Sequence, residues 1–377
     1  MSGRSFPVAR SGGRAAHDLS RAIRPTNSLR HGDRTAGKAK RSLRLVQRPL
    51  GEQVIVVTGA SSGIGLATAR AAARRGAAVV LAARSGETLE RVAHEIEADG
   101  GRCAAVVADV SVETDVRRIA QTAVERFGGF DTWVNNAGAA VYDTLTDMPI
   151  EEHRKTFETN YWGTVYGSLV AVRHFREHPG GGTLVNVGSV NGDVAVPYLS
   201  AYGATKHAVK GFTNALRMEL LYERAPVQVT LIKPSGIATP FPQHARSRIG
   251  AEPRVVPPLY APELVADAIL HAATHRVRDL TVGAAGRIVA AAAAIAPNLM
   301  DRVLAFAVPP VTRSSHPLTT TDNLEQGGSG GEVHYPYFRG LPFSLHTEAM
   351  KRPLATAVIA AGVAAVALGW VRRRAGR

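Results

Sequence analysis

The sequence predicts an α/β protein with a doubly wound parallel sheet, in which helices cover both faces of the sheet to give three layers. From residue 51 to about residue 286, short Val/Ile/Leu runs alternate with helix-like stretches, which is the sequence form of such a sheet. The first apolar run leads directly into a glycine-rich turn and then into an alanine-rich stretch. The chain has 377 residues and ordinary hydrophobic content, so it can bury a sizeable core.

The apolar runs place seven strands along this part of the chain. In order, they are expected at residues 53–57, 77–83, 102–108, 132–136, 182–188, 227–233 and 280–283. Helices are expected between them, since parallel strands need crossover connections.

Four regions are expected along the chain. Residues 1–50 are rich in Arg, Ser and Gly without apolar periodicity, which predicts a disordered basic extension. Its alternatives are an organelle transit peptide and a start codon placed too far upstream; it holds no apolar run like a signal-peptide core. Residues 51–310 form the folded domain. Residues 311–350 are polar and contain "GGSGG", which predicts a flexible linker, and residues 351–377 are an apolar helix with a basic end.

The charge distribution excludes a nucleic-acid-binding core. Of the formal charge of +14, residues 1–50 hold twelve Lys/Arg against two acids and residues 351–377 hold six Lys/Arg and no acid, which leaves about −2 for the body. The single cysteine, Cys103, excludes an intramolecular disulfide. No Cys/His/carboxylate group has metal-ligand spacing, so no metal is expected.

The glycine-rich turn reads "TGASSGIG" at residues 58–65. A strand that enters such a turn and opens a helix binds anions, because glycine lets backbone N–H groups approach a pyrophosphate and the helix N-terminus adds partial positive charge. The spacing is Gly59-x3-Gly63-x-Gly65, and its alternative is a tight strand-to-helix turn without a ligand.

Arg84 favours NADP(H) over NAD(H) as the cofactor. The second strand ends near Ala83, where an NAD site would place Asp or Glu on the ribose 2′-OH. A guanidinium instead suits a 2′-phosphate. The alternative is a solvated loop charge.

Tyr202 and Lys206 are four residues apart and therefore share a helix face. A tyrosine that ionises near pH 10 needs about 4 kcal/mol of differential stabilisation to act as a base near pH 7, which a close ammonium and a nicotinamide charge can supply. Ser189 ends a strand at the carboxyl edge of the sheet, where its hydroxyl can bind a substrate carbonyl.

Together these residues resemble the short-chain dehydrogenase/reductase family, in its subclass with one Rossmann-like domain. The resemblance covers about residues 51–286. It rests on the glycine motif, on "NNAG" at residues 135–138 and on residues found in the same order and spacing: Asp109, Val110, Asn160, Ser189, Tyr202 and Lys206.

The resemblance implies a role for each of these positions. Tyr202 is then the acid/base, Lys206 lowers its pKa and binds the nicotinamide ribose, and Ser189 orients the carbonyl. Asn160 holds a water in a relay to Lys206. The implied cofactor site comprises Gly59, Ser61, Ser62, Gly63, Ile64, Gly65, Arg84, Asp109, Val110, Asn136, Ala137, Gly138, Tyr202, Lys206, Pro234, Ile237 and Thr239.

One departure from the family pattern concerns the loop after the sixth strand, which reads "KPSGIATPF". Ser235 stands where glycine is expected, and Gly236 is expected to take over the backbone freedom. Ile237 and Thr239 remain placed to contact the nicotinamide end.

Residues 240–262 fall where the family has a mobile substrate lid. Their apolar side chains, Phe241, Val255, Val256, Leu259 and Tyr260, suggest a pocket for a lipophilic carbonyl compound or its alcohol. Alternatively, they pack the lid onto the body.

Residues 354–371 are uncharged and are followed by three arginines. Eighteen helical residues span about 27 Å, just short of a hydrocarbon core of about 30 Å. A single membrane anchor, with a cytoplasmic catalytic domain, is favoured over a docked helix.

The sequence thus predicts an NADP-dependent oxidoreductase that forms homodimers or homotetramers through the helices holding Asn160 and Tyr202, as the resemblance implies. The alternatives are a dinucleotide sensor or scaffold without turnover and an NAD-linked alcohol dehydrogenase.

Overall fold

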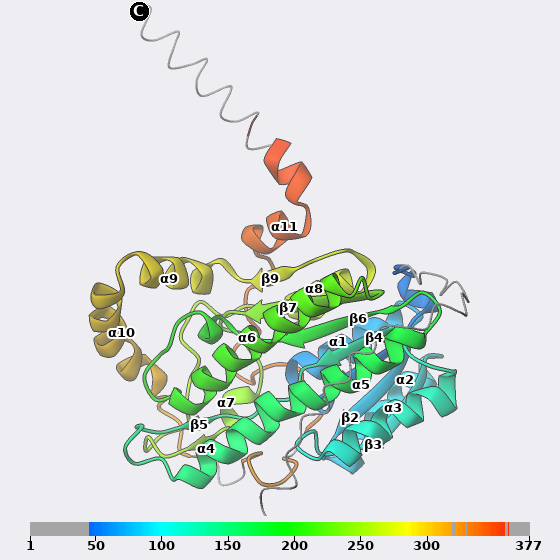
Figure 1. Ribbon diagram of the computed structural model, residues 1–377. Coiled ribbons are helices and arrows are strands. Elements are labelled where there is room, and N and C mark those ends of the chain that lie inside the picture. The colour runs from blue at the N-terminus through cyan, green and yellow to red at the C-terminus, as the bar shows by residue number, and fades with distance from the viewer. Residues whose placement is uncertain (1–44, 319–321, 329, 359–360, 362–377) are drawn as a thin grey trace, which may run out of the picture. The chain divides into compact units, whose positions relative to one another are not determined.

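The computed structural model describes residues 45–318, 322–328, 330–358 and 361. Within this part of the chain, seven parallel strands form one sheet in the order β3-β2-β1-β4-β6-β7-β9 (Figure 1). The strands are β1 (Val54–Thr58), β2 (Ala78–Ala83), β3 (Arg102–Val107), β4 (Thr132–Asn135), β6 (Gly182–Val187), β7 (Val227–Pro234) and β9 (Asp279–Val282). Their positions follow the apolar runs closely, and the α/β fold class is confirmed.

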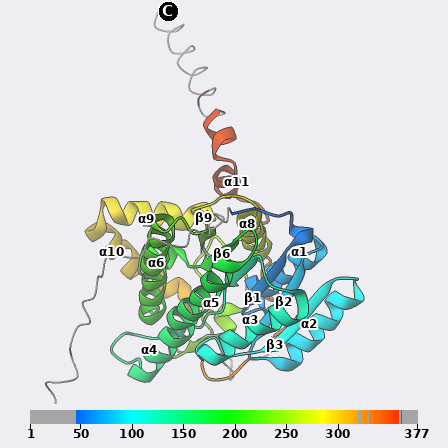
Figure 2. The ribbon, with the colours of Figure 1, turned by 45° about the vertical axis from the view of Figure 1, so that its right-hand side comes forward.

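Helices cover both faces of the sheet, as Figures 1 and 2 show. One face packs against α1 (Gly63–Arg74), α2 (Gly86–Ala98) and α8 (Pro262–Thr274). The other face packs against α3 (Glu113–Phe127), α5 (Gly163–Glu177) and α6 (Ser200–Tyr222). Strand β1 shows why both cores form: Ile55 and Val57 face one layer and Val56 faces the other, and all three are fully buried.

The sheet has a switch point between β1 and β4, where the chain changes the direction in which it adds strands. Connections from β1 lead outward to β2 and β3, and the chain then returns to place β4 on the other side of β1. The crevice beyond the carboxyl ends of two such strands is where open α/β sheets bind ligands.

Smaller elements surround this crevice. The strands β5 (Val141–Tyr142) and β8 (Arg246–Ser247) pair in parallel near α7 (Phe241–His244). Helix α4 (Ile150–Phe157) runs through a π-helical turn, η2 (Glu158–Trp162), into α5. Helices α9 (Ala284–Ile295) and α10 (Pro297–Thr312) project from one side of the domain in Figure 1, and α11 (Leu345–Lys351) lies beside β9. Two short 3₁₀ turns complete the elements, η1 (Leu50–Glu52) and η3 (Val190–Gly192).

The two chain ends bear on the remaining expectations. The basic extension predicted for residues 1–50 lies almost wholly outside the described residues, as does most of the membrane anchor predicted for residues 354–371. No helix among the described residues is both long and apolar enough to cross a membrane. The expected division into domains stays a prediction. Within the region predicted as a linker, however, residues 322–328 and 330–332 make specific contacts with the domain, which are described below.

Candidate active site

A cavity of about 360 Å³ opens at the carboxyl ends of β1, β2, β4, β6 and β7. All of the site residues predicted from the sequence line this cavity, except Gly65 and Asn160. The topology therefore brings together residues that are up to 180 positions apart in the chain, from Gly59 to Thr239.

The glycine-rich loop passes from β1 into the first turn of α1. A Cβ on Gly65 would collide with the carbonyl oxygen of Gly59, so the loop folds back on itself more closely than any side chain allows. A Cβ on Gly59 would lie 2.8 Å from the Cα of Ala137, at the end of β4. The cavity floor is therefore bare backbone at a helix N-terminus, which fits the pyrophosphate of a dinucleotide.

The "NNAG" segment fixes this floor to the neighbouring strand. Asn136 donates from Nδ2 to the carbonyl oxygen of Thr58 at 2.9 Å, and its backbone N–H donates to Thr58 Oγ1 at 3.0 Å. Asn135 is buried, and its Nδ2 donates to Asn186 Oδ1 on β6 at 2.9 Å. These bonds hold the ends of β1, β4 and β6 in register around the cavity.

The adenosine end of the cavity contains Arg84 and Asp109. The guanidinium of Arg84 lies 3.8 Å from the carboxylate of Asp109, which also accepts bonds from the N–H and hydroxyl of Ser111 at 2.9 and 2.7 Å. Arg84 also donates to the carbonyl oxygen of Asn323, far along the chain. Arg84 thus lines the cavity, with protein partners that the sequence does not predict, and its role toward a cofactor stays a prediction.

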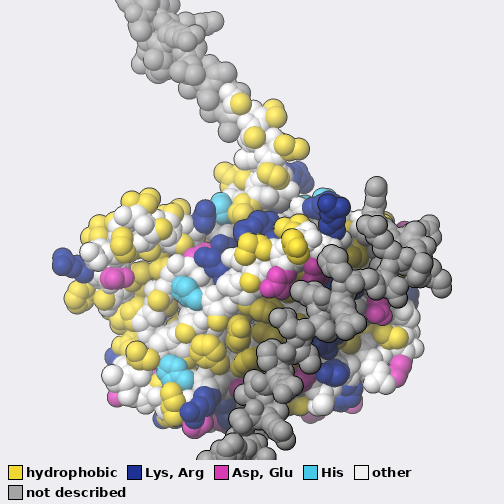
Figure 3. Space-filling view, viewed as in Figure 1, with side chains coloured by type: hydrophobic (Ala, Val, Ile, Leu, Met, Phe, Trp, Pro, Cys, Tyr) yellow, Lys and Arg dark blue, Asp and Glu magenta, His cyan; other side chains and the backbone are white. Residues whose placement is uncertain are grey.

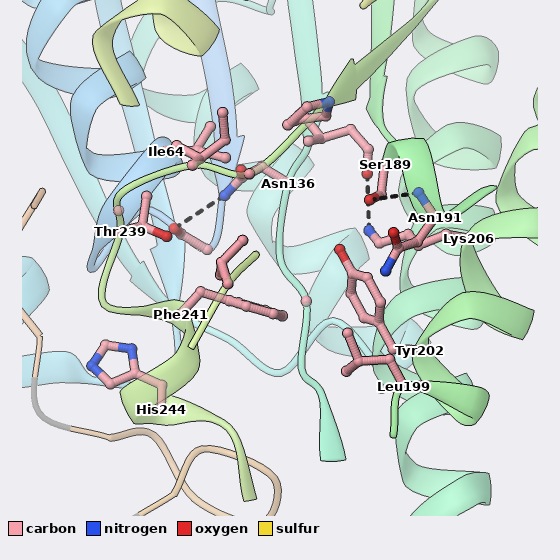
Figure 4. Close-up of a pocket in the computed structure, with 18 of the residues that line it drawn as sticks. Ile64, Asn136, Ser189, Asn191, Leu199, Tyr202, Lys206, Thr239, Phe241 and His244 are labelled. Atoms are coloured by element: carbon pink, nitrogen blue, oxygen red, sulfur yellow. Dashed lines mark hydrogen bonds between the residues drawn. The ribbon is translucent and has the colours of Figure 1, made fainter. Parts of the chain in front are cut away.

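Ser189, Tyr202 and Lys206 converge on the opposite wall (Figure 4). Ser189 follows β6 and accepts a hydrogen bond at Oγ from the N–H of Asn191 at 3.1 Å. Tyr202 and Lys206 lie on α6, where the Lys206 ammonium is 5.5 Å from the centre of the Tyr202 ring. Lys206 donates to the carbonyl oxygen of Val187 at 3.0 Å, which ties the helix to the end of β6.

Burial shifts the pKa values of both ionisable groups on this wall away from the charged form. Burial raises the pKa of Tyr202 to about 12, although a hydrogen bond with Ser189 opposes the increase. Burial also lowers the pKa of Lys206 to about 8. The protein alone therefore keeps Tyr202 protonated at neutral pH.

Asn160 lies within the π-helical turn between α4 and α5. Its Oδ1 accepts from the N–H of Ala139 at 2.8 Å, and its Nδ2 donates to the Ala139 carbonyl oxygen and to Thr205 Oγ1, each at 3.0 Å. Such turns recur at functional sites. Here the turn buries Asn160 completely beside the segment that holds Lys206.

The loop after β7 carries Pro234, Ile237 and Thr239 into the cavity. Ser235, the departure from the family pattern, accepts at Oγ from the N–H of Gly286 at 3.1 Å. Gly236 is a position of close approach, because a Cβ there would lie 2.9 Å from the carbonyl oxygen of Val256.

The predicted lid divides its apolar side chains between two environments. Phe241, Val255 and Val256 line the cavity, and the Phe241 ring lies 5.6 Å from that of Tyr202. Tyr260 is instead buried in the domain, where its hydroxyl accepts from the N–H of Ala284 at 3.2 Å. One part of the segment therefore lines the cavity and another part packs onto the domain, while the nature of the substrate stays a prediction.

Sequence reasoning missed several of the cavity residues, and two groups of them bear on the proposals below. Helices α9 and α10 contribute Val289, Leu304 and Val308, and the segment beyond α10 contributes Asn323, Gly327 and Gly328. The first group follows no strand end, and the second lies in a polar stretch, so no local signal marks either as part of a site.

The fold and cavity define a dinucleotide-dependent oxidoreductase class, and comparison with known proteins specifies it. The short chain dehydrogenase family model matches residues 53–250, and the chain belongs to this family of NAD(P)-dependent dehydrogenases and reductases.

Three similar proteins illustrate the relationship. The uncharacterized oxidoreductase YxnA of Bacillus subtilis is 41% identical over 85% of this chain and 92% of its own length. A short chain dehydrogenase/reductase from Burkholderia phymatum, solved with NAD, aligns with a TM-score of 0.62 and 25% identity over 67% of this chain and 96% of that one. An alcohol dehydrogenase from the archaeon Thermococcus sibiricus, complexed with 5-hydroxy-NADP, aligns with a TM-score of 0.53 and 28% identity over 61% and 95%.

Proposed function

We propose that this protein transfers hydride between NADP(H) and a lipophilic carbonyl compound or its alcohol, with Ser189, Tyr202 and Lys206 as the catalytic residues. The observation that carries the proposal is that this trio and the glycine-rich loop face each other across one cavity. When bound, the dinucleotide would supply or accept the hydride, and the loop residues Ser61 to Ile64, which line the cavity, would hold its pyrophosphate.

Tyr202 is proposed as the general acid in reduction and the general base in oxidation. In reduction, its hydroxyl would donate a proton to the substrate oxygen, while Ser189 Oγ donates a hydrogen bond to the same oxygen. Ionisation of Tyr202 near neutral pH requires positive charge close to the phenol, because burial alone raises its pKa to about 12. We propose that the Lys206 ammonium, 5.5 Å from the centre of the Tyr202 ring, supplies that charge.

Asn160 is proposed as a positioning residue for the proton relay. Its side-chain atoms bond to Ala139 and Thr205, so the amide is fixed rather than free to turn. Thr205 precedes Lys206 in α6, and the Asn160 contact therefore fixes the turn that carries the ammonium. The backbone carbonyl oxygen of Asn160 accepts a hydrogen bond from the Thr164 hydroxyl, and its second lone pair can accept from the relay water.

NADP(H) is proposed over NAD(H) because Arg84 directly follows β2, next to the ribose position. A guanidinium can bind a 2′-phosphate through two N–H groups. The Asp109 carboxylate, 3.8 Å away, would keep that guanidinium at the adenosine end.

A lipophilic substrate is proposed because part of the cavity wall is apolar. Val289, Leu304 and Val308 of α9 and α10 line the cavity together with Phe241. An apolar wall of this kind favours a substrate with an apolar body, at about 0.8 kcal/mol per buried methylene.

Subunit association and membrane attachment are proposed for separate surfaces. A dimer or tetramer is proposed through η2, α5 and α6, where Trp162 and Leu169 are exposed by 41% and 40%.

Residues 354–371 are proposed as a membrane anchor, which would hold the catalytic domain at the cytoplasmic face. Removal of residues 350–377 should then shift the protein from the membrane to the supernatant fraction.

Oxidation of NADPH and NADH against a panel of carbonyl compounds tests the proposed reaction. The panel runs from small aldehydes to steroid and fatty ketones, and we expect turnover with NADPH that improves with the apolar size of the substrate. Binding of the dinucleotide without turnover of any carbonyl or alcohol in the panel would contradict the proposal and favour a sensor.

A further inference from the structure

A segment far from the glycine-rich loop in sequence crosses the adenosine end of the cavity. We call it the strap and define it as residues 322–328 and 330–332, all of which the structure describes. Its contacts fall into two anchors and a middle section.

The first anchor joins the strap to α7 and β8. Asp322 accepts a bidentate pair of bonds from Arg246, at 2.8 and 3.2 Å, and the N–H of Asn323 donates to the His244 carbonyl oxygen at 2.8 Å. Leu324 is only 3% exposed. It packs in a small apolar cluster made by Ala139, Val141, Met148 and Ala201.

The second anchor joins the strap directly to the glycine-rich loop. The N–H of Gly63 donates to the Glu332 carbonyl oxygen at 2.9 Å, and the N–H of Gly331 donates to the Ser61 carbonyl oxygen at 2.8 Å. Both are backbone–backbone hydrogen bonds, made by the loop that is proposed to bind the pyrophosphate.

The middle section covers Arg84 and Ser85. Arg84 donates to the carbonyl oxygens of Asn323 and, at 3.4 Å, of Glu325, and Ser85 Oγ donates to the Gly328 carbonyl oxygen at 2.7 Å. A Cβ on Gly327 would lie 2.8 Å from Ser85 Oγ and 3.0 Å from the backbone of Arg84. The glycines that resemble a flexible linker thus allow the strap to approach this backbone closely.

The strap forms part of the cavity wall and does not fill the cavity. Asn323, Gly327 and Gly328 line the same cavity as Ser61 and Arg84, which stays open beneath them. The strap carbonyl oxygens accept from the guanidinium N–H groups that a 2′-phosphate would use. A 2′-phosphate at Arg84 would therefore compete with these oxygens for the guanidinium.

We propose that the strap closes the adenosine end of the cofactor site and must open for the cofactor to enter or leave. The proposal rests on the dinucleotide function proposed above. Opening is a local event, because it breaks the bonds of the two anchors and exposes one buried side chain, Leu324, while the sheet and its two cores stay intact. The rate at which the cofactor enters and leaves then depends on how fast the strap, a C-terminal segment, opens.

A reversible cross-link tests the proposal most sharply. The double variant Ser85→Cys/Gly327→Cys places two thiols where the Gly327 Cβ position and Ser85 Oγ are 2.8 Å apart, while the native Cys103 stays buried elsewhere. NADPH binding is followed by stopped-flow fluorescence in the oxidised full-length protein and again after reduction. We expect oxidation to slow NADPH association and release by at least about tenfold, a difference of about 1.4 kcal/mol in the barrier, and reduction to restore both rates.

A second variant decides the question if the disulfide does not form. Leu324→Ala loosens the first anchor, and Leu318→Ala removes the same side chain at a 44% exposed position outside the strap. NADPH should dissociate at least about tenfold faster from Leu324→Ala than from the wild type or from Leu318→Ala. Equal dissociation rates in all three proteins, or in the oxidised and reduced double variant, would overturn the strap proposal alone. Absence of NADPH and NADH binding to the wild type in calorimetry would overturn the proposed function with it.

Discussion

At the scale of single residues, Arg84 is the position proposed to determine the choice between NADP(H) and NAD(H). It is held between Asp109 and the strap, so its guanidinium is already aimed at the adenosine end. A charge-assisted hydrogen bond is worth about 1.5–3 kcal/mol, which corresponds to roughly 10–100-fold in affinity.

Arg84→Gln should therefore weaken NADPH binding about 10–100-fold and leave NADH binding within about threefold. The dissociation constants of both cofactors, measured by calorimetry, check this prediction. Arg91→Gln is the matched control, because Arg91 also donates to the strap, at Gly330, but does not line the cavity. An equal loss of affinity for the two cofactors in Arg84→Gln would contradict the assignment of Arg84 to the 2′-phosphate.

Lys206 gives a residue-scale prediction about stability. Its pKa is lowered from 10.5 to about 8 in the folded state, so between these values the unfolded chain binds more protons than the folded protein. The free energy of unfolding of the wild type should consequently rise with pH in this window, by up to about 1.4 kcal/mol per pH unit from this group. Below about pH 8 the lysine is charged in both states, and the full cost of its burial is present.

Lys206→Met removes this titration while it keeps most of the side-chain volume. Urea unfolding of both proteins at pH 7.5, 8.5 and 9.5 should show a steeper rise for the wild type than for the variant. Parallel pH dependences would mean that the ammonium is not desolvated in the folded protein.

At the scale of elements, α9 and α10 carry two separate sets of apolar side chains, one that lines the cavity and one that is exposed. Leu304 and Val308 line the cavity, whereas Ile295, Leu299 and Phe306 are exposed by 85%, 61% and 81%. Figure 3 shows hydrophobic side chains gathered over this pair of helices. The two sets can therefore be changed independently.

Leu304→Gln should lower kcat/KM for long-chain ketones by about 5–30-fold, a loss of about 1–2 kcal/mol of apolar contact, and barely change it for small aldehydes. Leu299→Gln, the same substitution on the exposed side of α10, should leave both substrates unaffected. Steady-state kinetics with the two substrate classes checks the prediction. Equal effects of Leu304→Gln on both classes would place the substrate body elsewhere.

The strands and the common helix face of Tyr202 and Lys206 could be predicted because the sequence patterns that indicate them are local. Each β-strand is a short apolar run, and Tyr202 and Lys206 are one helical turn apart, so their common face follows from the helix period alone. The glycine-rich loop was also predictable from a local signal. The close approach of Gly65 to Gly59 leaves no space for a side chain, so glycine is needed there and its spacing is visible in the sequence.

The strap and the α9–α10 wall could not be predicted in this way. Arg84 and Asn323 are 239 residues apart, and their contact uses a backbone carbonyl oxygen that every residue possesses. A polar, glycine-rich composition is typical of a flexible linker, and it also suits a segment that must approach another backbone. Only the three-dimensional arrangement distinguishes these two outcomes.

At the scale of the whole molecule, the exposed aromatic and apolar side chains on η2 and α5 predict self-association. Trp162 stacks on Tyr166 at 5.9 Å between ring centres, and Leu169 lies one turn further along α5. Leu169→Glu should shift the protein from dimer or tetramer toward monomer, because a carboxylate in an apolar interface loses its hydration.

Light scattering after size-exclusion chromatography checks this prediction. Leu299→Glu is the control, since Leu299 lies on α10, outside the proposed interface, and is 61% exposed. An unchanged mass for Leu169→Glu would exclude this face as the principal subunit contact.

The central claim concerns the phenol of Tyr202 as the acid/base, and Tyr202→Phe tests it most directly. The variant keeps the ring that packs against Phe241 and removes only the hydroxyl. We expect the NADPH dissociation constant to stay within about threefold of the wild type and kcat to fall by about 10²–10⁴-fold, the usual contribution of a positioned proton donor. Retention of kcat within about tenfold, with NADPH binding intact, would contradict the proposed mechanism.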